Sequence, residues 1–196
     1  MNYKAITATL LTSLVSFSIC AEAEHKLGLK GNYINQDASN DLLTGKSSDS
    51  TFGYGVEYTA LLPFSTSPDN KAKVGLNLSF DAFELKHNIF GGSNNLGSDF
   101  DVFTIAPIFA YSIDNNIDVY TKIGMAFWDA SLLLDEIPYS ASLDGEDIVF
   151  GIGATYQSSN GAYSGIEITK QEYSDSGFSS DTMILTIKAG FKFGGH

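Results

Sequence analysis

Apolar and polar residues alternate with a period of two along most of the chain beyond residue 24. From Phe52 to Leu62 every second residue is apolar or aromatic, and nearly all the positions between them hold glycine or polar residues. This period predicts β-strands with two different faces, and no convincing period of 3.6 that would predict an amphipathic helix is present. The candidate strands lie at 27–33, 52–62, 74–81, 103–113, 117–127, 148–156, 162–173 and 185–193.

The number of strands and the lengths of their connections predict how the strands are arranged. An even number permits antiparallel closure with both chain ends on one side. The polar connections 36–50, 87–99 and 130–146 are long, whereas 114–116 and 158–161 are short. Long connections at one end and short turns at the other are typical of outer-membrane barrels. We therefore predict an all-β fold, an eight-stranded antiparallel up-and-down transmembrane β-barrel with long extracellular loops and short periplasmic turns.

The direction of the apolar faces separates a membrane barrel from a soluble, lipocalin-like carrier. An eight-stranded interior is only just wide enough for side chains, so glycine and short polar residues fit it better than aromatic rings. The apolar faces are therefore predicted to contact lipid, with aromatic girdles at both membrane interfaces. The expected loop-end girdle is Tyr33, Phe52, Tyr54, Phe103 and Phe127, and the expected turn-end girdle is Tyr111, Tyr156, Phe191 and Phe193.

Residues 1–23 have the features of a secretory signal peptide. Lys4 supplies the positive charge, 5–19 is uncharged and mostly apolar, and Ala21-Glu22-Ala23 fits a cleavage site. An apolar stretch this short is unsuited to spanning a bilayer, which needs about 20 residues. We expect cleavage after residue 23 and a mature barrel domain at 24–196. Cys20, the single cysteine, then leaves with the signal peptide, and bulky Ile19 before it argues against lipid attachment.

Composition excludes some classes of function. The chain has 196 residues, a net charge of −12 and no arginine, so it lacks the basic surface that nucleic-acid binding needs. We expect no nucleic-acid partner and no cofactor. Charged residues make up 17% of the chain, below the roughly 25% of soluble domains.

Three stretches resemble the OmpA-like transmembrane domain and related small outer-membrane barrels. Asn116–Trp128 is similar to the family's fifth strand, 149–156 with 165–167 to its sixth and seventh strands, and 187–194 to its closing strand. The resemblance implies an outer-membrane barrel inserted by the assembly machinery. Because the chain stops at His196, we do not expect the periplasmic peptidoglycan-binding domain of larger members. Phe193 takes the place of their terminal aromatic residue.

Four charged residues fall on the predicted inward faces: Glu57, Lys122, Glu167 and Lys188. Unpaired charges in a narrow interior are costly, so we expect ion pairs, with Glu57 bound to Lys122 or Lys188. Such pairs either fill and rigidify the barrel or gate small ions, the role proposed for a lumenal cluster in OmpA-like barrels. Of that cluster only Glu57 carries over, because the other positions correspond to Ile108, Thr155 and Gly165.

Two further groups were weighed for chemistry. The third connection is acidic, with Asp129, Asp135, Glu136, Asp144, Glu146 and Asp147. It lacks the spacing of a calcium loop and is predicted to be a solvated surface, so no metal site is assigned. His87 has Ser93, Ser98, Asp99 and Asp101 as partners for lipid-modifying hydrolysis, but no fixed motif links them. No catalytic residue is assigned.

The leading hypothesis is an integral outer-membrane barrel with a structural and cell-surface role through its extracellular loops, in adhesion or interaction. Expected partners are outer-membrane lipid, lipopolysaccharide, the assembly machinery and a host surface or phage, and we expect a monomer. The alternatives are a narrow pore gated by lumenal charges, a lipid-modifying enzyme and the soluble carrier.

Overall fold

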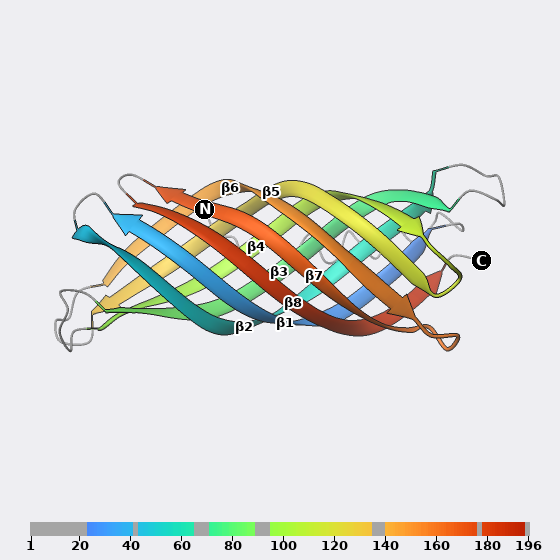
Figure 1. Ribbon diagram of the computed structural model, residues 1–196, viewed down its shortest axis with the longest axis horizontal. Coiled ribbons are helices and arrows are strands. Elements are labelled where there is room, and N and C mark those ends of the chain that lie inside the picture. Colours follow the sequence, from blue (N-terminus) through green and yellow to red (C-terminus); the bar gives the residue numbers. More distant parts are fainter. Residues whose placement is uncertain are drawn as a thin grey trace.

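The strands close into a single barrel. The computed structural model describes residues 23–40, 43–64, 71–88, 95–134, 140–175 and 178–194. Eight antiparallel strands follow one another around the barrel in chain order, as Figure 1 shows, and β8 pairs with β1 to close it. The strands are β1 (Glu24–Asn40), β2 (Leu43–Pro63), β3 (Ala72–Asn88), β4 (Asn95–Ser112), β5 (Ile117–Leu134), β6 (Ser140–Gln157), β7 (Ala162–Asp175) and β8 (Phe178–Gly194). No described residues form a helix long and apolar enough to cross a membrane.

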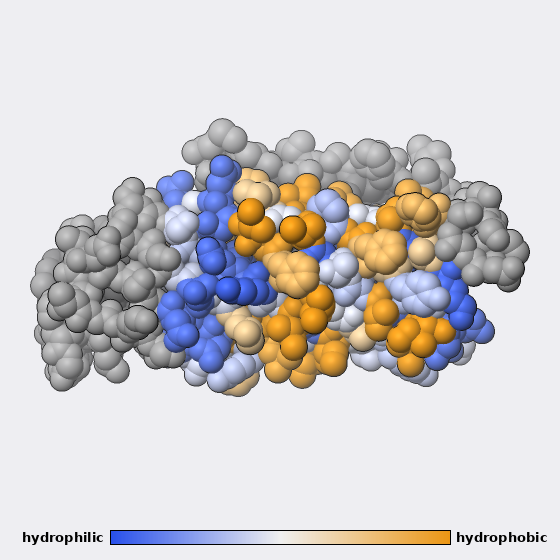
Figure 2. All heavy atoms as spheres, turned by 45° about the horizontal axis from the view of Figure 1, so that its top comes forward, coloured by the Kyte–Doolittle hydropathy of each residue, from blue (hydrophilic) through white to orange (hydrophobic). Residues whose placement is uncertain are grey.

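Alternate side chains point outward and inward, as the period of two predicts. Leu29 on β1 and Ile187 on β8 are 70% and 67% exposed, whereas Lys30 and Lys188, the next residues along each strand, are buried. Apolar residues gather over the middle of the barrel and toward its turn end, and hydrophilic residues predominate in the zone on the outer side of this band (Figure 2). An exposed apolar surface of this kind suits lipid and not water.

The nine aromatic residues predicted as girdles lie on outward-facing positions. Seven of them are among the exposed large side chains: Tyr33, Phe52, Tyr54, Tyr111, Tyr156, Phe191 and Phe193. Phe103 and Phe127 are half-buried because they face each other across β4 and β5 and their rings stack at 6.5 Å. Tyr33 and Phe52 likewise face each other on β1 and β2, with ring centroids 5.4 Å apart.

The long loops predicted for one end are mostly paired strand. Within 36–50, Gln36 faces Asp49 and the pairing continues outward to Asn40 and Leu43. The ranges 87–99 and 130–146 are likewise paired over most of their length. A transmembrane strand needs about 9–11 residues, whereas these strands have 14 to 21. The sequence overestimated the loops because polar strand residues beyond the membrane lack the apolar face that marks a strand in sequence.

The outer end of the barrel divides into two sheets. Pairing of β6 with β7 stops at Val149 and Gln171, and pairing of β2 with β3 stops at Gly53 and Phe83. The other six ladders continue farther outward. One four-stranded sheet therefore contains β3 to β6, and the other contains β7, β8, β1 and β2, which separate at the left of Figure 1. We call the separation beyond Val149 and Gln171 the β6–β7 fork.

The interior of the outer half contains an apolar and aromatic cluster beside buried polar side chains such as Gln36 and Gln171, and the sequence prediction of a small and polar lumen missed this cluster. Phe83 and Phe100 stack at 5.0 Å, and the Trp128 ring meets Tyr173 edge-on at 5.7 Å. We call this cluster the outer plug. Its buried members are Ile34, Phe83, Leu85, Phe100, Val102, Ala126, Trp128, Ala130, Val149 and Tyr173. Strands of 14 to 21 residues are longer than a bilayer requires, and an end that extends into water needs a core of its own.

Candidate functional site

The centre of the lumen is an ion-pair network. Lys188 on β8 places its ammonium nitrogen 3.0 Å from a Glu57 oxygen on β2 and 3.4 Å from a Glu167 oxygen on β7. Lys122 on β5 binds the other Glu167 oxygen at 2.8 Å. All four side chains are at least 96% buried. Two cations and two anions balance, as a low-dielectric interior requires.

Neutral groups complete the hydrogen bonding of these carboxylates. The Tyr120 hydroxyl donates to Glu167 at 2.7 Å, and the Tyr163 hydroxyl donates to Glu57 at 3.0 Å. The Lys188 ammonium also lies 4.7 Å from the centre of the Tyr120 ring. A buried charge is tolerated when it is both paired and hydrogen-bonded, and each carboxylate here meets that condition.

A second cluster of charges lies at the turn end of the lumen. Lys26 binds Glu24 at 3.0 Å and Asp118 at 2.9 Å, and Lys73 binds the same two carboxylates at 3.1 and 3.3 Å. The Ser112 hydroxyl donates to Asp118 at 2.6 Å. These interactions join β1, β3, β4 and β5 across the end of the barrel.

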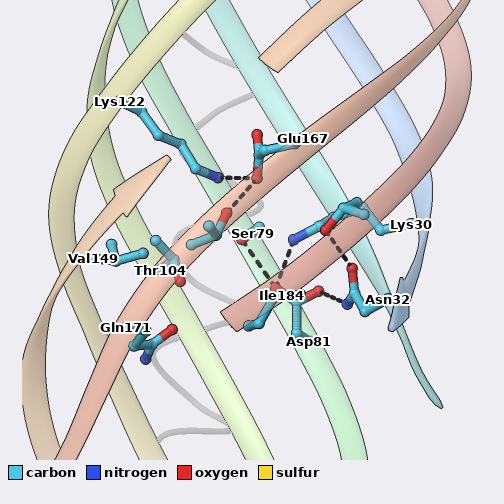
Figure 3. Close-up of a pocket in the computed structure, with 12 residues that line it drawn as sticks. Lys30, Asn32, Ser79, Asp81, Thr104, Lys122, Val149, Glu167, Gln171 and Ile184 are labelled. Atoms are coloured by element: carbon cyan, nitrogen blue, oxygen red, sulfur yellow. Dashed lines mark hydrogen bonds and ion pairs between the residues drawn. The ribbon is translucent and has the colours of Figure 1, made fainter. Parts of the chain in front are cut away.

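A third charged group lies on the outer side of the central network. Figure 3 shows Lys30 and Asn32 of β1 pointing toward Asp81 of β3, at 2.7 and 2.6 Å, with Lys122 and Glu167 beside them. Asp81 also accepts a hydrogen bond from Ser79 at 3.3 Å. The three groups together fill the lumen from the turn end to the outer plug.

Large side chains fill the space left by inward-facing glycines. A β-carbon on Gly153 would meet the Tyr120 hydroxyl, and one on Gly28 would meet the Tyr163 hydroxyl. On Gly145 it would lie 2.6 Å from the Trp128 ring. These three inward glycines therefore accommodate neighbouring rings. Among the described residues, the lumen contains small cavities of about 20 and about 10 Å³, each with room for about one water molecule.

All four lumenal residues predicted from sequence lie in the central network, and Glu57 binds Lys188 and not Lys122. The positions matched to the OmpA-like cluster, Ile108, Thr155 and Gly165, carry no charge. The prediction missed the charged residues Glu24, Lys26, Lys30, Lys73, Asp81 and Asp118. Two of them could have been predicted from the alternation on β1, because Lys26 and Lys30 fall on the row opposite the outward-facing Leu27 and Leu29.

Tyr173 in the outer plug is fully buried. Its hydroxyl has no hydrogen-bond partner among the described residues. Burial, together with Asp81 and Asp147, raises the pKa of this phenol, so it stays protonated. The amides of Gln36 and Gln171 nearby also contain atoms without a partner in the described chain.

The outward faces of the outer end carry rows of carboxylates. Asp129 on β5 faces Asp101 on β4 and Asp144 on β6, and all three are exposed. On the other sheet, Asp181 faces both Glu172 and Asp37. Like charges directly opposite one another destabilise a sheet by a few tenths of a kcal/mol to about 1 kcal/mol. This arrangement therefore costs stability and gives the outer end a negative surface, which Lys170 partly offsets by pairing with Asp181 at 3.4 Å.

Asp147 differs from its acidic neighbours because it points into the β6–β7 fork. It accepts hydrogen bonds from the Trp128 indole at 2.8 Å and from the Ser174 main-chain N–H and hydroxyl at 3.0 and 2.8 Å.

Asp135, Glu136 and Ser93 lie outside the described residues, as does the side chain of His87. Ser98 is buried in the interior whereas Asp99 and Asp101 are exposed, so Ser98 and these carboxylates do not converge on one face.

The chain belongs to the outer membrane protein β-barrel domain family, whose profile matches residues 7–193. It is therefore an integral β-barrel of the bacterial outer membrane. A search of curated protein sequences found no match.

Solved structures of small outer-membrane barrels share this fold. OprG from Pseudomonas aeruginosa is 12% identical with a TM-score of 0.60, and the alignment covers 88% of this chain and 96% of OprG. Ail, the attachment invasion locus protein of Yersinia pestis, in complex with the heparin analogue sucrose octasulfate, is 16% identical with a TM-score of 0.55 over 88% of this chain and 99% of Ail. Neisserial surface protein A is 12% identical with a TM-score of 0.54, over 84% and 97% of the two chains. At these identities, the similarity shows a shared fold alone.

Proposed function

We propose that this protein is a structural and cell-surface barrel that binds a partner on a host surface, another cell or a phage through the outer extensions of its strands. The observation that carries the proposal is the length of the strands, which continue beyond the apolar band as two separated sheets with acidic outer faces. A filled lumen supports a rigid platform for these sheets. Outer-membrane lipid and lipopolysaccharide surround the apolar band, the assembly machinery inserts the chain, and the barrel is a monomer.

The charge of the outer end predicts what kind of partner binds. Ail has been crystallised with a polyanionic heparin analogue. Here Asp101, Asp129 and Asp144 form an exposed row, and the range 123–169 contains no lysine. A surface of this sign attracts cationic partners and repels polyanions.

The test is adhesion of cells that display the protein. Binding to host cells is expected to require the outer extensions, so that the triple variant Asp101→Asn, Asp129→Asn, Asp144→Asn loses most of it at equal surface abundance. Heparin is expected not to compete. The matched control is Lys71→Gln, an exposed position beside a turn at the opposite end. Equal adhesion by the triple variant, or by cells lacking the protein, would contradict the proposal.

A narrow pore is the second candidate. The observation that favours it is the position of the central network between the two cavities, one lined by Lys122 and Glu167 and the other by Glu57 and Lys188. Conductance of the refolded protein in a planar bilayer, beside its boiled and unboiled gel mobility, tests it. A mobility shift with a silent bilayer supports the platform, and steady conductance that changes in Glu57→Gln supports the pore.

A further inference from the structure

The two sheets of the outer end are held together there by side chains. Beyond the β6–β7 fork, and beyond the end of the β2–β3 ladder at Gly53 and Phe83, no hydrogen bond between main-chain groups of described residues joins them. The connections at this end run from β1 to β2, from β3 to β4, from β5 to β6 and from β7 to β8, so each joins strands of one sheet. The sheets can therefore move apart at the outer end without breaking a ladder.

Two kinds of side-chain contact bridge the sheets. Ser174 on β7 donates its N–H and hydroxyl to the Asp147 carboxylate on β6, at 3.0 and 2.8 Å. The Tyr173 ring packs against Phe100 and Trp128 of the other sheet, with ring centroids 5.5 and 5.7 Å apart. These are contacts that a ligand of suitable chemistry can replace, because rings and hydrogen bonds are both available to it.

The sheet of β7, β8, β1 and β2 carries a patch of unpartnered polar groups on its inner face. Thr182 on β8 faces both Gln36 on β1 and Gln171 on β7, so the two glutamines lie in one row, and Tyr173 follows two residues along β7. Both amide atoms of Gln36, the Gln171 amide nitrogen and the Tyr173 hydroxyl are buried without a hydrogen-bond partner in the part of the chain that the structure describes. Unpaired buried groups are costly and rare in native proteins, so four of them in one patch indicate a role in binding.

The facing sheet presents aromatic rings to this patch. Phe83 on β3 and Phe100 on β4 stack at 5.0 Å, and the Trp128 ring of β5 lies beside Phe100 at 6.1 Å. One wall of the outer interior is therefore a set of hydrogen-bonding groups, and the opposite wall is a set of rings. Sites for small molecules are built in this way, from apolar and aromatic surface with a few placed polar groups.

The spacing and charge of the polar patch limit what it can bind. Gln171 and Tyr173 are about 7 Å apart along their strand, and Gln36 lies about 10 Å from Gln171 across two strand spacings. Amide and phenol groups both donate and accept hydrogen bonds, as sugar hydroxyl groups do. Lys30 and Asp81 nearby already pair with each other at 2.7 Å, so no charge is left over for an ionic ligand.

We propose that the space between the two outer sheets binds the ring of a neutral sugar, which the sheets admit by parting at the β6–β7 fork. The amides of Gln36 and Gln171 and the Tyr173 hydroxyl bind the hydroxyl groups around the rim of the sugar. Its C–H face packs on the rings of the other sheet. The acidic outer rows repel anionic sugars. The inference goes beyond the proposed function, because it requires no partner cell.

Ordered water is the competing occupant of the polar patch. Gln171 lines the cavity of about 20 Å³, which has room for about one water molecule. A water there satisfies one amide without any movement of the sheets, whereas a sugar ring requires them to part. The two occupants therefore differ in whether sugar changes the environment of the rings.

The fluorescence of Trp128 tests the proposal, because this residue is the single tryptophan of the chain and lies in the outer plug. The probes are glucose, galactose and N-acetylglucosamine, three neutral sugars with an apolar ring face, added at millimolar concentration to the refolded full-length protein in lipid nanodiscs. At least one is expected to give a saturable change in emission. Mannitol, which has no ring, and glucuronate, which is charged, are the controls that should not. No response to any of the three sugars, or an equal response to mannitol, would overturn the proposal.

Protein variants locate the site. Gln36→Leu and Tyr173→Phe each remove polar atoms that have no partner among the described residues, so both are expected to fold as stably as the parent protein. Each is expected to weaken sugar binding about threefold to tenfold, the effect of one lost hydrogen bond. Tyr156→Phe, which removes an exposed hydroxyl at the turn end, is the control that should leave binding unchanged. Unchanged binding by both Gln36→Leu and Tyr173→Phe would overturn the assignment of the polar patch.

A disulfide across the fork tests whether the sheets must part. Asp147→Cys and Ser174→Cys are combined with Cys20→Ser, and thiol titration measures how much of the pair has formed a disulfide. Oxidation is expected to block sugar binding, and reduction is expected to restore it. Equal binding by the oxidised and reduced forms would overturn entry through the fork. If the disulfide does not form, the Gln36→Leu and Tyr173→Phe titrations still decide, and adhesion of displaying cells in the absence of sugar binding leaves the proposed function standing.

Discussion

Lys188 on β8 lies 3.0 Å from Glu57 on β2, although 131 residues separate them in the chain. The contact exists because barrel closure pairs β8 with β1, whose other neighbour is β2. Lys188 also contacts Glu167 on β7, so one ammonium group joins three strands around the point of closure. The central network therefore stabilises the closed barrel, whether or not the lumen conducts ions.

Lys188→Met is expected to destabilise the barrel by about 3–5 kcal/mol, because it leaves the buried Glu57 carboxylate without its cation. Urea unfolding in lipid vesicles, followed by gel mobility, measures the loss. Lys170→Met is the matched control, since its pair with Asp181 is exposed, and its cost is expected to be below about 1 kcal/mol. Adding Glu57→Gln to Lys188→Met is expected to recover part of the stability by restoring charge balance, and additive losses would contradict the pairing.

Three buried tyrosines are expected to respond differently to replacement by phenylalanine. Tyr120→Phe and Tyr163→Phe each remove a hydrogen bond to a buried carboxylate, at an expected cost of about 1.5–3 kcal/mol. Tyr173→Phe removes a hydroxyl without a partner among the described residues and is expected to be neutral or stabilising. The same unfolding measurement compares all three, and a large loss in Tyr173→Phe would reveal a hydrogen bond to that hydroxyl.

Gly28→Ala is expected to destabilise the barrel by about 1–3 kcal/mol, because the new methyl group meets the Tyr163 hydroxyl and the Ala189 carbonyl. Gly31→Ala lies on the same strand but faces outward, where the nearest atom is 4.0 Å away. It is therefore expected to be tolerated. Equal effects of the two substitutions would show that Gly28 does not face the lumen.

Ile187→Lys is expected to destabilise the barrel by about 2–4 kcal/mol, the cost of a charge near the middle of the lipid-facing band. Ile187 lies midway along the outward row of β8, between Met183 and Phe191. Ser131→Lys, on an exposed position of the outer extension, is expected to change stability by less than about 0.5 kcal/mol. Membrane extraction and unfolding of both variants measure the two stability losses and so locate the outer limit of the lipid-facing band. A large loss in Ser131→Lys would show that the band extends farther outward than Ser131.

The sequence by itself determined the strand number, the direction of each face and four charged lumenal residues. Those features depend on a local period of two and on the limited width of an eight-stranded interior, which the chain records residue by residue. Glu57 and Lys188 could be placed inside before any partner was known. The cleavage of residues 1–23 stays a prediction, because residues 1–22 lie outside the described part of the chain.

Only the tertiary structure decided which charges pair, where the apolar cluster lies in the lumen and where the barrel divides. Pairing of Lys188 with Glu57 depends on the stagger between strands far apart in sequence. The outer plug depends on four aromatic rings, from Phe83, Phe100, Trp128 and Tyr173, meeting from β3, β4, β5 and β7. The fork at Val149 and Gln171 depends on where one ladder stops while its neighbours continue. Register and ladder length are set by the whole closed sheet, so no single strand contains the information that fixes them.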